Sequence, residues 1–125
     1  MSPPSFLISS LLVALGGGLG AWLRFVAGRL VGSTAFPYAT LSINVLGSLA
    51  MGLLAGWLAR QGSETEGWRL LLGVGVLGGF TTFSAFSLEI VTLAQRGAIG
   101  VAAAYAALSL AGGIIGLIAG LRIMA

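Results

Sequence analysis

Four long apolar segments, joined by short loops, constrain this chain more than any other feature of its sequence. They cover about residues 6–30, 38–59, 68–94 and 98–123. Each is long enough to cross a bilayer as a helix, which takes roughly 20 residues. Only 7% of the residues are charged, whereas soluble domains carry roughly 25%. The sequence therefore predicts an all-α membrane protein with a single four-helix transmembrane domain over residues 1–125.

The third segment carries residues that do not favour a transmembrane helix. Its stretch GGFTTFSAF, residues 78–86, places two glycines before two β-branched threonines, and this combination weakens a helix. Backbone that leaves the helix at membrane depth is tolerated where protein buries it or where it lines a cavity. We therefore predict that the third helix is broken near its middle. Such a break would free carbonyl oxygens to bind a hard cation.

Glycines recur at intervals of four in three of the segments, which favours close contact between helix backbones in lipid. In the first segment Gly16, Gly20, Gly28 and Gly32 follow this spacing, and Arg24 occupies the remaining place in the row. Because four helices enclose little volume, we expect these packing faces to continue into a second subunit.

The residue types that the chain lacks exclude several kinds of catalysis. The chain has six arginines and three glutamates, and it has no Cys, His, Lys or Asp. Thiol, imidazole and lysine-based catalysis are therefore excluded, and we do not expect an enzyme. The arginines are scattered rather than clustered, so the positive net charge does not predict binding to nucleic acid.

The arginines also specify membrane orientation poorly. If both termini and the central loop share one side, three arginines lie there and two or three lie opposite. The near balance leaves two alternatives open: one orientation stabilised by a partner, or insertion both ways as an antiparallel homodimer. The two groups are Arg60, Arg69 and Arg122 against Arg29 and Arg96, with Arg24 ambiguous.

Neutral polar residues recur at helical spacing inside the second and fourth segments. Thr40, Asn44 and Ser48 share one helix face, and Tyr105 and Ser109 share another. Asn44 has too many polar groups for a bond to its own backbone, so either an interhelical hydrogen bond or a permeation role is open. The donors in this set suit an anion better than a cation.

Two charged residues lie deeper within the spans than the others. Arg24 either extends to the membrane interface or stands at the mouth of an anion path. Glu89 is expected to pair with an arginine across an interface, and it is a poor candidate for a catalytic acid because no second carboxylate stands near it in sequence.

Phe83 and Phe86 are three residues apart, just beyond the expected break. Their positive ring edges could contact a small anion. Packing is nevertheless the commoner role of phenylalanine in a membrane helix.

Four stretches in order along the chain resemble the Fluc (CrcB) family of fluoride channels: GGGLGAWLRF, TLSINVLGS, GVLGGFTTFSAFSLE and YAALS. The resemblance implies a dual-topology, antiparallel homodimer in the bacterial inner membrane, with lipid around it. It also implies two fluoride pathways that export fluoride passively and so keep its cytoplasmic concentration low.

The resemblance further implies which residues line the fluoride pathway. They comprise an aromatic pair, a pore asparagine, a polar track and two further hydroxyls: Phe83 and Phe86; Asn44; Thr40, Tyr105 and Ser109; Thr82 and Ser84.

The same resemblance places a structural Na⁺ at the centre of the dimer, on the main-chain carbonyls of Gly78 and Thr81. It places Arg24 near the pore entrance. One departure is visible, because Gly113 stands where some members continue the polar track with a serine.

Two other functions were weighed. A small dual-topology multidrug exporter also has four helices but needs a membrane-embedded carboxylate early in the chain, and no acid precedes Glu64. A non-transporting assembly subunit would need only glycine packing faces, which leaves Asn44 and the broken helix unexplained.

Overall fold

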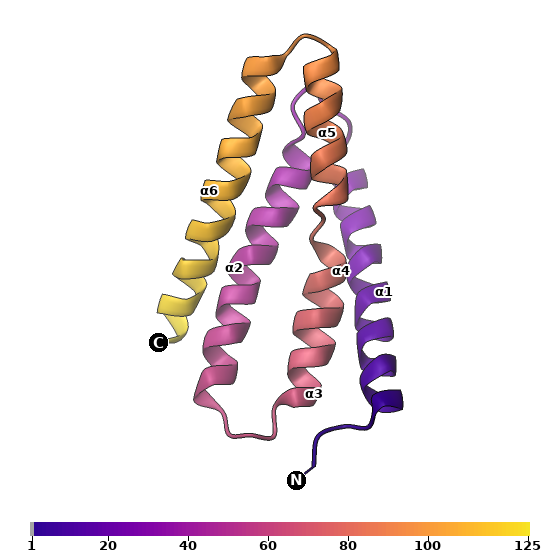
Figure 1. The fold of residues 1–125 in the computed structure, drawn as a ribbon, viewed down its shortest axis with the longest axis vertical. Helices are drawn as coiled ribbons and strands as arrows, with labels where there is room; N and C mark the ends of the chain where they lie inside the picture. Colours follow the sequence, from indigo (N-terminus) through magenta and orange to yellow (C-terminus); the bar gives the residue numbers. More distant parts are fainter. Residues whose placement is uncertain (1) are drawn as a thin grey trace.

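The structure, a computed structural model, describes residues 2–125 as a bundle of four membrane-length helices (Figure 1). Residue 1 of the predicted domain lies outside the described residues. The third span consists of four consecutive helical pieces, so the labels run further than the spans. The elements are α1 (Phe6–Val31), α2 (Tyr38–Arg60), α3 (Glu66–Trp68), η1 (Arg69–Leu77), α4 (Gly78–Phe80), α5 (Ser84–Gln95) and α6 (Ile99–Met124).

These bounds agree with the predicted spans to within two residues at every end. All four spans are apolar enough over at least 18 residues to cross a membrane. Figure 1 shows the chain alternating in direction, with both termini and the loop between α2 and α3 toward the same end of the bundle. The predicted four-helix arrangement is confirmed.

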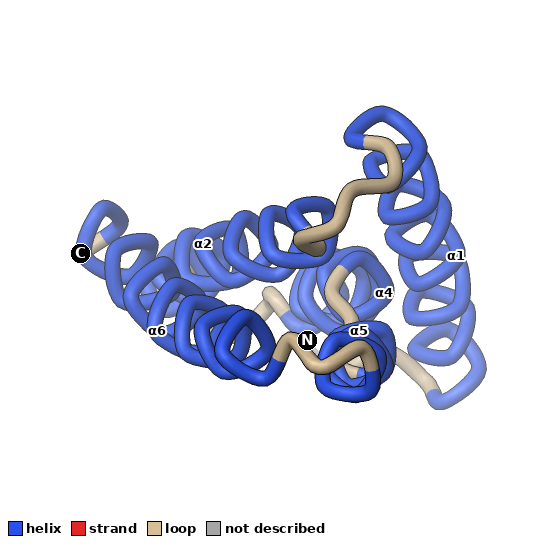
Figure 2. Tube along the Cα trace, turned by 90° about the horizontal axis from the view of Figure 1, so that it is seen from above, coloured by secondary structure: helices blue, strands red, loops and turns tan. Residues whose placement is uncertain are grey.

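The four spans pack as two pairs, α1 with the third span and α2 with α6. Seen from above, α2 lies beside α6, and α1 lies on the opposite side of α4 (Figure 2). Large apolar side chains cover the outside, including Phe6, Leu15 and Leu110, while few side chains are fully buried. This distribution suits a chain whose outer surface meets lipid rather than water.

Glycine allows the helix pairs to touch backbone to backbone. A methyl group added at Gly20 of α1 would lie 2.0 Å from the carbonyl oxygen of Val76, and one added at Gly52 of α2 would lie 2.1 Å from that of Leu117. The predicted packing role is therefore confirmed at these positions. It is not confirmed at Gly28, where an added methyl would meet no atom within 4 Å.

The third span is broken near its middle, as predicted, over residues 81–83 (the break). Phe80 ends α4, and Thr81 then has extended backbone angles (φ −81°, ψ 156°) before α5 begins at Ser84. The glycines do not unwind the helix as expected, because Gly73 to Gly79 remain helical, largely as a π-helix. Gly75 and Gly79 serve contact with α1 instead: a methyl added at Gly79 would lie 2.4 Å from the carbonyl oxygen of Gly17.

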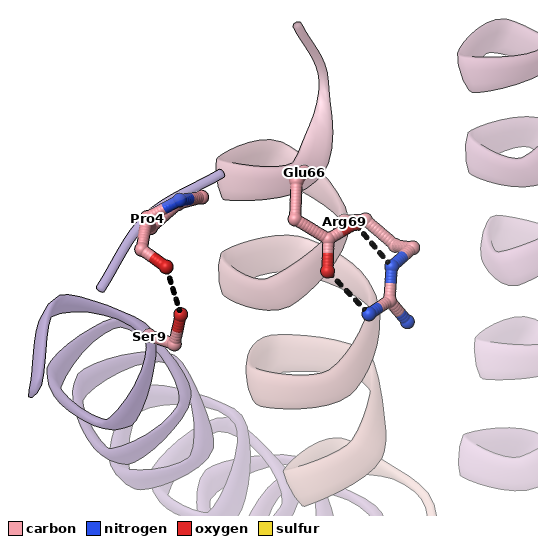
Figure 3. Close-up of polar contacts among 4 residues, drawn as sticks. All are labelled: Pro4, Ser9, Glu66 and Arg69. Atoms are coloured by element: carbon pink, nitrogen blue, oxygen red, sulfur yellow. Dashed lines mark hydrogen bonds and ion pairs between the residues drawn. The ribbon is translucent and has the colours of Figure 1, made fainter. Parts of the chain in front are cut away.

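Polar contacts gather at the end of the bundle where the third span begins. The guanidinium of Arg69 binds both carboxylate oxygens of Glu66, at 2.6 and 2.8 Å, and the Ser9 hydroxyl donates to the Pro4 carbonyl at 3.5 Å (Figure 3). Both contacts join residues close in sequence, so they stabilise the helix ends rather than the bundle.

Candidate functional site: the broken third helix and its polar contacts

The side chain of Asn44 holds the break from α2. Its Nδ2 donates to the carbonyl oxygen of Thr82 at 2.9 Å, and its Oδ1 accepts from the Thr82 amide at 2.8 Å. A backbone residue outside a helix has no neighbouring turn to pair with, and lipid offers no water in exchange. Asn44 supplies both missing partners. Of the two roles left open by the sequence, the structure shows the interhelical hydrogen bond.

Arg24 holds the other side of the break from α1. Its Nε donates to the carbonyl oxygen of Gly79 at 3.2 Å, and its side chain is half-buried. The guanidinium therefore contacts the end of the half-helix α4 and is not simply extended to the membrane interface. Gly79 lies one residue before the last of α4, where a cation is favoured by the helix dipole.

The hydroxyls in and beside the break are used locally. Thr81 donates to the carbonyl of Leu77, the last residue of η1, at 2.9 Å. The Thr82 hydroxyl oxygen accepts from the amide of Ala85 at 3.1 Å, as a capping residue does at the start of a helix. Ser84 is exposed, with its hydroxyl 3.3 Å from that of Thr82. The break thus ends one helix and caps the next.

A second polar cluster surrounds the carboxylate of Glu89. Its Oε1 accepts from the Thr40 hydroxyl at 2.6 Å and its Oε2 accepts from the Tyr105 hydroxyl at 2.8 Å. The cluster therefore joins α2, α5 and α6. The expected arginine partner of Glu89 is not among its contacts within residues 2–125. Two hydroxyl donors take its place, since a carboxylate away from water needs hydrogen bonds.

The aromatic pair Phe83 and Phe86 divides between surface and core. Their ring centroids are 5.7 Å apart, yet Phe83 is 76% exposed and Phe86 only 8%. Phe86 packs at 5.2 Å against the fully buried ring of Tyr105, which Phe36 meets edge-on at 5.5 Å. Phe36 was missed by the sequence reasoning, because a residue in a loop before a proline shows no helical spacing.

Ser109, the remaining residue of the predicted polar track, differs in its contacts from Thr40 and Tyr105, and Ser48 and Gly113 lie outside that track. The Ser109 hydroxyl is buried and forms no hydrogen bond within the described chain. Ser48 donates to the carbonyl of Asn44, a residue of its own helix, at 2.7 Å. Gly113 contributes no hydroxyl, and a methyl group added there would lie 3.4 Å from the Ser48 oxygen.

An open cavity of about 280 Å³ lies against the break. Its walls combine apolar side chains with the polar groups of the break: Asn44, Gly47, Ser48, Met51, Thr81, Thr82, Phe83 and Leu117. The cavity is therefore lined on one face of the chain by the exposed Phe83 and by Thr82, whose backbone is bound by Asn44.

Comparison with known proteins identifies the family. The family model described as CrcB-like protein, Camphor Resistance (CrcB), matches residues 11–121. The chain belongs to the CrcB family. Two similar relatives, from Novosphingobium aromaticivorans and Rhodopseudomonas palustris, are both named fluoride-specific ion channel FluC. The first is 63% identical over 90% of this chain and 92% of its own length. The second is 55% identical over 91% of this chain and 94% of its own length.

In this CrcB-family protein the predicted site residues form two groups rather than one continuous row. The group at the break comprises Arg24, Asn44, Gly78, Thr81, Thr82, Phe83 and Ser84. The group at Glu89 comprises Thr40, Phe86 and Tyr105. Ser109, one turn from Tyr105 on α6, has no hydrogen-bonded partner in the described chain.

Proposed function

We propose that this protein is a fluoride-selective ion channel that passively exports fluoride and so lowers its cytoplasmic concentration. The observation that carries the proposal is the 63% identity, over most of both chains, to a relative named as a fluoride-specific ion channel. A multi-pass membrane protein of this family acts in the inner membrane of a bacterium.

The chemistry of the two residue groups supports an anion path. Fluoride is strongly hydrated, so a narrow path must replace its water with donors. The hydroxyls of Thr82 and Ser84 and the amide of Asn44 offer donors at the break. The Ser109 hydroxyl offers one further along, one turn from Tyr105, whose own proton is donated to Glu89. Phe83 and Phe86 contribute ring edges, whose positive character attracts a small anion weakly enough to release it.

The active form in this proposal is an antiparallel homodimer with dual topology. Three observations support a partner at the break: the 76% exposure of Phe83, the open cavity beside it, and the near balance of arginines between the two ends of the bundle. Polar backbone groups left open at the break would be poorly solvated by lipid alone.

A structural Na⁺ at the dimer axis fits the backbone at the break. Within residues 2–125, no hydrogen bond ends on the carbonyl oxygen of Gly78 or of Thr81. Carbonyl oxygens are hard ligands of the kind that unwound transporter helices offer to Na⁺. The ion would satisfy these carbonyls and hold the two copies together, and replacing Na⁺ throughout purification is therefore expected to weaken the dimer.

Fluoride efflux from liposomes containing the purified protein tests the function. We expect rapid passive efflux of fluoride and little efflux of chloride, without a proton gradient. Protein-free liposomes are the control. Absence of fluoride efflux would refute the channel, and proton-driven uptake of a cationic dye would favour the multidrug exporter instead.

A further inference from the structure

The guanidinium of Arg24 replaces a hydrogen bond that the break removes. In a continuous helix the carbonyl of Gly79 would accept the amide of residue 83, four positions later. Residue 83 lies beyond the end of α4, so this carbonyl has no intrahelical donor. The Arg24 Nε occupies that position instead, at 3.2 Å and from a residue 55 positions earlier in the chain.

The contact follows from the glycine row on α1. Gly16 and Gly20 bring α1 against the third span so closely that an added methyl at Gly20 would also lie 2.8 Å from the Phe80 amide nitrogen. Arg24 is the next residue on the same helix face. Gly20 contacts the backbone of Phe80, the last residue of α4, so Arg24, one turn further along α1, lies beside the end of α4. Arginine at this place can therefore reach the last carbonyls of the half-helix.

The hydrogen bond from Arg24 to Gly79 stabilises the protein more in the membrane than it would at a helix end exposed to water. A carbonyl without a donor is costly where lipid replaces water. A guanidinium is a charged donor, which makes a stronger hydrogen bond than a neutral group does. Its positive charge also faces the negative end of the helix dipole. Loss of Arg24 would leave the Gly79 carbonyl unpaired and the last turn of α4 free to fray or to rejoin α5.

We propose that Arg24 is a positioning residue for the anion path. It holds the end of α4 from α1, while Asn44 holds Thr82 from α2, and the two contacts together fix how α5 presents Phe83. This role differs from attraction of anions to a pore entrance, which acts through charge alone. The part of this role that is measured by fluoride efflux rests on the proposed function as a fluoride channel.

The test compares Arg24→Gln with Arg29→Gln as a matched control. Both variants remove one positive charge from α1, but Arg29 is exposed, lies over the Phe25 ring of its own helix and has no hydrogen bond to the third span. In Arg24→Gln we expect amide hydrogen exchange in residues 77–83 to accelerate about tenfold or more, the scale expected for a charge-assisted hydrogen bond. Fluoride efflux should fall by a similar factor. Arg29→Gln should match the wild type in both measurements.

Salt dependence separates positioning from charge attraction. An entrance charge acts through solvent, so the deficit of Arg24→Gln would shrink as ionic strength rises from about 0.05 to about 0.5 M. A positioning contact predicts the same deficit at both salt concentrations. Arg24→Lys keeps the charge and a donor, and it should recover most of the exchange protection.

Two results would overturn the inference: unchanged exchange in residues 77–83 of Arg24→Gln, or a flux deficit that disappears at high salt. If Arg24→Gln does not assemble, Arg24→Lys carries the test. Its flexible ammonium should leave exchange two- to fivefold faster than in wild type, whereas wild-type exchange with lost flux would count against positioning. If wild-type protein conducts no fluoride, the proposed function fails, and the exchange measurement still decides the role of Arg24.

Discussion

Replacing Asn44 by leucine removes both hydrogen bonds to the backbone of Thr82 while keeping a side chain of similar size. The bonds measure 2.8 and 2.9 Å and satisfy the amide and the carbonyl of the same residue. Leucine offers neither a donor nor an acceptor. Both Thr82 groups would then lie without partners inside the membrane, or the break would have to close into a continuous helix.

The cost follows from the two groups that lose their partners. A buried polar group left unsatisfied costs about 1–3 kcal/mol. Hydrogen bonds between membrane helices average only about 0.6 kcal/mol, because unfolded helices in the membrane also find partners. Two such groups would cost about 2–6 kcal/mol, and because membrane hydrogen bonds are weaker we expect a loss of about 2–4 kcal/mol in the free energy of unfolding, in the lower part of this range. Closure of the break would limit this cost but would rotate α5, so fluoride efflux should fall at least tenfold.

Unfolding in detergent by titration with dodecyl sulfate measures the first quantity, and efflux from liposomes measures the second. Ser48→Ala is the matched control, because Ser48 lies one turn further along α2 and bonds only to a carbonyl of its own helix. We expect the control to change stability by less than about 0.5 kcal/mol. An Asn44→Leu protein with the stability and efflux of Ser48→Ala would refute the proposal that the two Asn44 hydrogen bonds hold the break in place.

Three further predictions follow from other contacts. Gly20→Ala should abolish assembly or lower the unfolding midpoint strongly, because its methyl would overlap the backbone of the third span, whereas Gly18→Ala, with no atom within 4 Å, should unfold as the wild type does. Phe83→Ile and Phe86→Ile should slow fluoride efflux with the dimer intact on size-exclusion chromatography, and wild-type rates in both would remove the aromatic pair from the path. Tyr105→Phe removes one of two donors to the half-buried carboxylate of Glu89 and should destabilise the protein by about 1–3 kcal/mol in the same titration, so an unchanged midpoint would contradict this hydrogen bond.

The spans were predictable because each depends on local composition alone. Apolar segments of sufficient length gave all four helices to within two residues at their ends. The break was also predictable in place, since β-branched residues follow glycines in its sequence. The cause of the break was not predicted correctly, because the glycines at 73–79 remain helical, and two of them, Gly75 and Gly79, serve contact with α1. Glycine in a sequence is compatible both with an unwound helix and with close contact between helices, and which of the two occurs depends on the neighbouring helix.

The contacts of the candidate site were less predictable because they join distant parts of the chain. Asn44 and Thr82 are 38 residues apart, Arg24 and Gly79 are 55 apart, and each pair depends on which helices become neighbours. Helical spacing placed Thr40 on one face with Asn44 but could not indicate that the two meet different parts of the third span. The sequence likewise did not indicate that Thr40 and Tyr105 bind Glu89 within the chain, and its expected pairing with an arginine across an interface stays a prediction.

The different environments of Phe83 and Phe86 follow from the way α5 is held. Phe86 and Glu89 are three positions apart in α5 and so share one face of the helix, and Thr82 lies in the break just before it. Thr82 is fixed to α2 by Asn44, and Glu89 is fixed to α2 and α6 by Thr40 and Tyr105. These hydrogen bonds hold both ends of α5's inner face and so set the rotation of α5. Phe86 lies between them and is buried, whereas Phe83 lies off this face and remains exposed, which leaves its ring available to a second copy of the chain.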